Sequence, residues 1–134
     1  MRAQTAFEYL MIFSIILAIV GILTLYAGEM TKRNEDDIRV ANVMTVVNKI
    51  VEAANIVYTQ GKPSQITLNL YIPEGVESIE ISDKKILIKV RVSNGLTDVF
   101  AFSKASLQGS ISLTPGTKKI KVIAEENYVN ITES

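Results

Sequence analysis

The chain has 134 residues with 14 basic and 14 acidic side chains, and it contains neither cysteine nor histidine. The balanced charge gives no reason to expect a nucleic-acid partner. The missing residue types exclude disulfides, cysteine-bound metals, and catalysis by a serine–histidine or cysteine–histidine pair within the chain. We therefore expect a protein that is not an enzyme and that needs no cofactor.

The N-terminal segment is apolar over the thickness of a bilayer. From Tyr9 to Gly28 no residue is charged, and twenty helical residues span about 30 Å. The apolar core of a cleaved secretory signal is shorter, about 7–15 residues. We therefore expect residues 4–30 to stay on the protein as a helix that spans a membrane or an equally apolar environment. Tyr9 and Tyr26 bracket the run either as interfacial anchors or as interhelical packing residues.

A second helical pattern covers residues 35–60. Gly61 and Pro63 are expected to end it, and because no proline precedes Gly61, one continuous rod is compatible with the sequence. Gly21, Gly28 and the charged patch at 29–37 are the expected places for a break, and the two glycines are read either as tolerated or as points of close helix contact. Apolar residues recur every three or four positions, at Val40, Val43, Val47, Ile50, Ala54 and Val57, with Ile38, Met44, Val51 and Tyr58 widening the stripe.

Residues 64–133 change to the period of two that is typical of strands. Six or seven short strands are expected, joined as an antiparallel meander that packs on the apolar stripe of the helix, which makes the fold class α+β. Asn94-Gly95 is the sharpest hairpin signal and Pro115-Gly116 the next. The pairs Lys84-Lys85 and Lys118-Lys119 are interpreted as turn and strand-edge lysines that discourage edge pairing.

The first eight residues place a small-residue junction, Ala3-Gln4, before the apolar run, which reverses the order of a secretory signal. Cleavage there would make Gln4 the amino terminus of the helix. Burying the Glu8 carboxylate in an apolar medium costs several kcal/mol unless it is paired or protonated. The new ammonium group at Gln4, in the same chain or a neighbour, is a natural partner. The alternative places Glu8 at the headgroups, next to the positive end of the helix dipole.

The stretch "QTAFEYL" resembles the class III signal peptide of archaeal type IV pilins, which carries a Gln-x-Ser-x-Glu core before a hydrophobic helix. Gln4 and Glu8 match that core, Ala6 stands in place of the serine, and the leader "MRA" is shorter and less basic than usual. Residues 53–81 and 95–122 also look like the corresponding parts of small pilin-like proteins with that signal. The likeness covers nearly the whole chain.

This resemblance implies that three parts of the chain have different roles. A prepilin peptidase would remove the leader, residues 1–3, and an assembly ATPase with a membrane platform protein would draw residues 4–30 from the membrane into a filament core. Residues 31–134 would form an extracytoplasmic head, made of the amphipathic helix 35–60 and the antiparallel sheet 64–133. The protein would then be a subunit of a helical homopolymer on the cell surface that serves adhesion, with Gln4 and Glu8 setting its register.

Other interpretations stay open at this point. A monomeric, membrane-anchored, extracytoplasmic binding module is the main alternative, and a minor pilin or pseudopilin is another; a tethered hydrolase is more remote. Asn130 begins an Asn-Ile-Thr sequon that is glycosylated or silent with equal weight. The carboxylates Glu35, Asp36 and Asp37 are interpreted as a solvated cluster in preference to a cation site.

Overall fold

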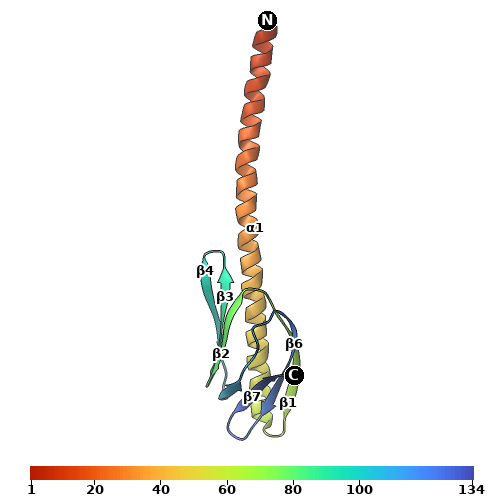
Figure 1. Cartoon of the computed structure of the whole chain (residues 1–134), viewed down its shortest axis with the longest axis vertical. Coiled ribbons are helices and arrows are strands. Elements are labelled where there is room, and N and C mark those ends of the chain that lie inside the picture. The colour runs from red at the N-terminus through yellow and green to blue at the C-terminus, as the bar shows by residue number, and fades with distance from the viewer. The chain divides into compact units, whose positions relative to one another are not determined.

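A computed structural model describes all 134 residues, from Met1 to Ser134. The chain forms two compact units, residues 1–35 and residues 36–134, and the second is called the folded unit below. One helix contributes to both units and seven strands follow it (Figure 1), so the predicted α+β class is confirmed. The elements are α1 (Arg2–Gln60), β1 (Gln65–Ile72), β2 (Val76–Ser82), β3 (Lys85–Val92), β4 (Gly95–Phe102), β5 (Leu107–Gly109), β6 (Gly116–Ala124) and β7 (Val129–Glu133).

Helix α1 ends where the sequence predicts. Gly61 adopts a φ of 75°, and its N–H donates to the Val57 carbonyl at 2.9 Å, which is the left-handed arrangement that glycine allows at a helix end. Of the two possibilities left open upstream, the helix is the continuous one, because it runs without a break through Gly21, Gly28 and residues 29–37. An added Cβ at either glycine would meet nothing within 4 Å beyond the neighbouring backbone of the helix itself. The glycines therefore make no close contact within the chain.

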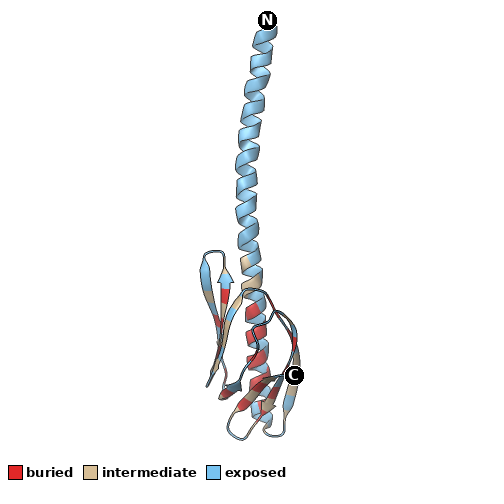
Figure 2. Ribbon diagram, in the orientation of Figure 1, coloured by how far each residue is buried: buried red, intermediate tan, exposed pale blue.

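The buried face of α1 lies in the folded unit, as Figure 2 shows in red. It differs from the predicted stripe, since Ile38, Met44 and Tyr58 are exposed while Val46 and Ala53 are buried. The central positions of the predicted stripe, Val43, Val47, Ile50, Ala54 and Val57, are buried as expected. The buried residues are Val43, Val46, Val47, Ile50, Val51, Ala53, Ala54 and Val57.

The strands form two sheets where the sequence suggested one meander. One sheet has the order β2-β3-β4 and is a true meander, with Val92 opposite Gly95 across the predicted Asn94-Gly95 hairpin. The other has the order β1-β6-β7-β5, in which β5 and β7 run parallel. The expected hairpin at Pro115-Gly116 is wrong, because β6 pairs with β1 and β7 and leaves β5 at the far edge.

The expectation that lysine pairs protect strand edges is also wrong. Lys85 lies on β3 and Lys119 on β6, and both strands are interior to their sheets. Lys118 points inward, in phase with Ile120 and Val122, and is 7% exposed. Its ammonium group is held by Ser112, by Thr114 at 2.8 Å and by Glu133 at 2.9 Å. A buried lysine is tolerated here because each of its three donors has an acceptor.

Polar contacts fasten α1 to the β2-β3-β4 sheet within the folded unit. The N–H of Ser93 donates to the Asp36 carboxylate at 2.9 Å, and hydrogen bonding to Ser93 lowers the pKa of Asp36 below its usual value. Further along the helix, the side-chain oxygen of Asn55 accepts the Ser103 hydroxyl at 3.0 Å and the Lys104 N–H at 2.9 Å. These contacts fix both ends of β4 against the helix.

Candidate assembly site on the apolar half of the helix

The apolar half of α1 is uncovered along its whole length. No residue of the chain before Val43 is buried, and the large apolar side chains between Phe7 and Met30 are 51–78% exposed. Figure 2 shows this part of the helix in pale blue throughout. By length and composition α1 contains one stretch that could cross a membrane. Side chains of this kind normally lie against lipid or against other protein.

The serine and threonine hydroxyl groups in this segment are satisfied within the helix. Ser14 Oγ donates to the Leu10 carbonyl at 2.8 Å, and Thr24 Oγ1 donates to the Val20 carbonyl at 2.8 Å. Thr31 makes the same contact four residues back. Such bonds remove the cost of placing a hydroxyl donor in an apolar medium. The segment is therefore suited chemically to surroundings without water.

Glu8 is the only charged side chain between Arg2 and Glu29. It is exposed, and it makes neither a side-chain hydrogen bond nor an ion pair in the chain. Gln4 lies one turn earlier on the same helix face. The structure therefore brings the two predicted assembly residues to one face, about 6 Å apart along the axis, without joining them.

The predicted cleavage point lies in the first turn of α1. Ala3 and Gln4 are exposed and helical, and the Thr5 N–H donates to the Met1 carbonyl at 3.3 Å. At the other end of the apolar segment, Glu29 and Arg33 form an exposed ion pair at 3.7 Å. A pair this exposed contributes little to stability. It lies where charged residues begin again along the sequence.

Asn130 and the acidic cluster lie outside the apolar segment, and Tyr9 and Tyr26 lie within it without a side-chain partner. Asn130 is half-buried on the interior strand β7, opposite Gln108 of β5. Of the acidic cluster, only Asp36 is engaged, through Ser93 and through Arg39 at 3.6 Å, and no group of carboxylates suited to a metal ion is present. Tyr9 and Tyr26 are 71% and 65% exposed.

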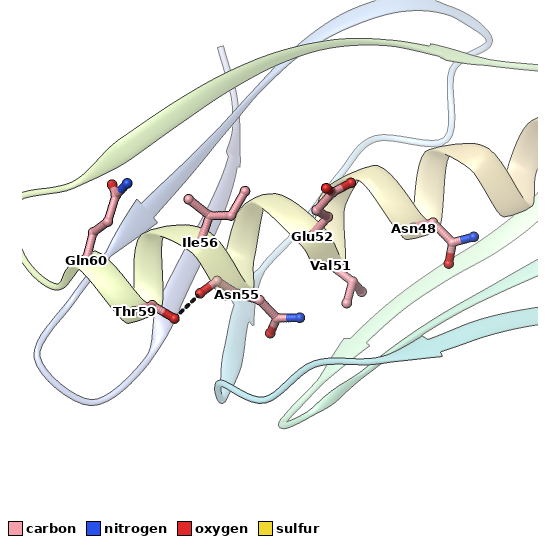
Figure 3. A pocket seen from close by; sticks show the side chains of 7 residues that line it. All are labelled: Asn48, Val51, Glu52, Asn55, Ile56, Thr59 and Gln60. Atoms are coloured by element: carbon pink, nitrogen blue, oxygen red, sulfur yellow. Dashed lines mark hydrogen bonds between the residues drawn. The ribbon is translucent and has the colours of Figure 1, made fainter.

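A hollow beside α1 was not anticipated from the sequence. It has a volume of about 620 Å³, and all of its lining residues come from the last turns of α1 (Figure 3). The hydroxyl of Thr59 donates to the Asn55 carbonyl at 2.8 Å, and the side chain of Asn55 is already held by Ser103 and Lys104. The lining residues are Asn48, Val51, Glu52, Asn55, Ile56, Thr59 and Gln60. The lining combines amides and a single carboxylate with the apolar side chains of Val51 and Ile56.

Comparison with protein-family models, with curated proteins and with solved structures gave no match to this chain.

Proposed function

We propose that this protein is the structural subunit of a type IV pilus-like surface filament, which polymerises through residues 4–30 and serves attachment. The observation that carries the proposal is the apolar length of α1 from Phe7 to Met30, where the chain buries none of its own side chains. Full burial of one large apolar side chain contributes about 1.5–3 kcal/mol. A bundle of such helices supplies that burial without any further contact from the folded unit.

Glu8 distinguishes a polymer from a plain anchor. In a helix that only spans a membrane, the carboxylate gains at most the interaction with the helix dipole at the headgroups, and burying it unpaired is costly. In a bundle of staggered copies, the amino group of Gln4 in one copy meets Glu8 of another. Such a pair sets the axial register more than it adds to stability.

The partners follow from the resemblance of the N-terminal motif. A prepilin peptidase acting at Ala3-Gln4 frees the amino group that Glu8 needs. An assembly ATPase and a membrane platform protein then move the helix from the membrane into the filament. The subunit accordingly passes from the cell membrane to the cell surface.

A second candidate is a monomeric binding module anchored in the membrane. The bilayer-length apolar segment and the open hollow beside Asn55 favour it. A minor pilin or pseudopilin is a variant of the first proposal, with fewer copies in each filament.

Electron microscopy of sheared cell-surface material, combined with mass spectrometry of the same fraction, tests the proposal. We expect filaments that contain this chain with Gln4 as its first residue. A chain found only as a monomer in the membrane fraction contradicts the proposal and favours the binding module. Chains that keep Met1 in cells contradict the processing step.

A further inference from the structure

The two sheets of the folded unit have four edge strands, and two of these edges are protected. β2 carries Glu77 and Glu80 and has a register shift between Val76 and Ser78. β5 has only three residues. Charges, irregular register and short length are the features that normally prevent an edge strand from pairing with another chain.

The other two edges, β1 and β4, are long and regular and carry almost no charge. Each strand has eight residues, pairs on one side only and keeps an unbroken register with its neighbour. Asp98 on β4 is the single charged residue of the two strands. The basic residues of the sheets lie instead on the interior strands β3 and β6, at Lys85, Lys89, Arg91, Lys118, Lys119 and Lys121.

Both open edges also expose apolar side chains. On the outward face of β4, Leu96 is 57% exposed, and Phe100 and Phe102 form an exposed edge-to-face pair with ring centroids 5.6 Å apart. Tyr71 is 55% exposed on β1. A long, apolar, regular edge of this kind is a pairing site for another strand.

The direction of β4 is fixed by its contacts with α1. Ser93, just before β4, bonds to Asp36, and Ser103, just after β4, bonds to Asn55. The strand therefore runs in the same direction as the helix.

The direction of β1 is opposite. Ser64, just before β1, bonds to Gln60 at the end of α1. Gly75, just after β1, lies against Arg39, since an added Cβ there would be 3.3 Å from Arg39 Cδ. Two copies whose helices point the same way therefore bring β4 of one copy antiparallel to β1 of the next.

In that orientation the two strands match over their full length. With Gly95 opposite Ile72 and Phe102 opposite Gln65, every outward residue faces an outward residue, as a pleated sheet requires. The inward residues Val99 and Ala101, which are buried and half-buried, then face the half-buried Leu68 and Ile66. The apolar side chains along both edge strands are then partly buried by the other copy.

The same alignment places Asp98, the one charged residue of the two edge strands, opposite a neutral residue. Asp98 of one copy lies opposite Asn69 of the next, and the neighbour of Asn69 on β6 is Lys119. Lys119 is exposed and has no ion pair within its own chain. Asp98 therefore meets no like charge across the new contact, and like charges directly opposite each other destabilise a sheet.

We infer that β4 of one copy and β1 of the next form a continuous antiparallel sheet between neighbouring folded units. The partner is a second copy of this chain. The inference rests on the proposed filament, because it takes the copies to be oriented alike. Each copy uses two different edges, so the contact is heterologous and can extend without limit.

Cross-linking in the full-length chain tests the inference, since the protein contains no cysteine of its own. The double variant Asn69→Cys with Asp98→Cys is treated in sheared filaments with a short bis-maleimide. We expect a ladder of dimers, trimers and larger species, because every copy carries both halves of the contact. The pair Thr67→Cys with Phe100→Cys lies in the same register and should give the same ladder.

Two kinds of control define the register. Each single variant should give no ladder. The pair Gln65→Cys with Asp98→Cys keeps the same two edges but is four residues out of register, about 13 Å, and should give only traces of product.

Three results separate the possible failures. Filaments in which neither in-register pair cross-links overturn the β1–β4 contact and leave the filament proposal standing. Dimers from Asp98→Cys alone indicate that β4 pairs with β4, which also overturns the inference. A wild-type chain that forms no filaments overturns the proposed function and the inference with it.

Discussion

The ammonium group of Lys118 lies 2.9 Å from the carboxylate of Glu133, with the lysine side chain 6% exposed and the glutamate side chain 33% exposed. The contact ties the last strand, β7, to the interior of the β1-β6-β7-β5 sheet. Ser112 donates both its N–H and its hydroxyl to the same carboxylate, at 3.0 and 2.7 Å. Together these groups hold the segment before β6 against the C-terminal strand.

Glu133 should make the folded unit sensitive to acid. The hydrogen bond from Lys118, with those from Ser112, lowers the pKa of Glu133 from 4.5 to about 2. A carboxyl group with a lowered pKa stabilises the fold above its unfolded pKa and loses that contribution as the pH falls towards the folded value. We expect Glu133→Gln to lower the urea midpoint at pH 7 and the difference from wild type to shrink between about pH 5 and pH 2.

Glu125→Gln is the matched control for this experiment. Glu125 also pairs with a lysine, Lys62, at 3.3 Å, but that lysine is 57% exposed, so the substitution should change the midpoint little. A pH-independent difference between wild type and Glu133→Gln would contradict the assigned role of Glu133.

Asn55→Ala should destabilise the folded unit by about 1–3 kcal/mol. The substitution removes the acceptor for the Ser103 hydroxyl and the Lys104 N–H. Asn48→Ala is the control, because Asn48 lines the same hollow without holding either group. Urea unfolding followed by circular dichroism measures both variants, and equal losses would contradict the prediction.

Ile50→Ala should cost about 2–5 kcal/mol, since it leaves a cavity where the side chain is fully buried. Met44→Ala should cost far less, because Met44 is 41% exposed. The comparison tests whether Ile50, and not Met44, belongs to the core. A larger loss for Met44→Ala would contradict this assignment.

Gly109→Ala should disrupt the parallel pairing of β5 with β7. An added Cβ at Gly109 would lie 1.9 Å from the Ile131 carbonyl oxygen, and the backbone has a φ of 130°. Gly116→Ala meets the same kind of strain at a φ of 126° but has open space around the new Cβ. We expect strain alone to cost about 1–3 kcal/mol at Gly116, and Gly109→Ala to lower the unfolding midpoint by more.

Glu8→Ala should leave membrane insertion and processing intact but reduce filament assembly. The substitution removes the charge that the proposed function pairs with the amino group of Gln4. Glu29→Ala, which removes the carboxylate at the other end of the apolar segment, should assemble as the wild type does. Counting filaments per cell by electron microscopy, with membrane levels measured on blots, compares them. Normal filaments from Glu8→Ala would contradict the register role.

Local features of the sequence predicted local structure well. The end of α1 at Gly61 and the hairpin at Asn94-Gly95 depend on residues within one turn of each other, and both are present. The exposed apolar segment was also predictable, because its composition alone defines it. The inward position of Lys118 could have been predicted as well, since it shares a period of two with Ile120 and Val122.

Long-range pairing was not predictable in the same way. β1 pairs with β6, so that Gln65 lies opposite Ile123. A turn motif predicts only the pairing of the two strands that it joins, so it gives no information about strands this far apart in the sequence. The exposure of Met44 and Tyr58 has the same origin, because helical periodicity defines a stripe but not which of its boundaries a sheet will cover. The contact between Asp36 and Ser93 likewise joins residues that are distant in sequence.

The hydroxyl bonds of Ser14 and Thr24 have one more consequence. Because those donors are already satisfied by carbonyls of their own helix, moving this segment from lipid into a bundle of like helices breaks none of these hydrogen bonds. Their contribution to the transfer free energy is therefore close to zero, and the difference between the two environments comes from packing and from the single carboxylate. In the proposed filament, Glu8 is then the group through which the segment distinguishes a neighbouring protein from a lipid tail.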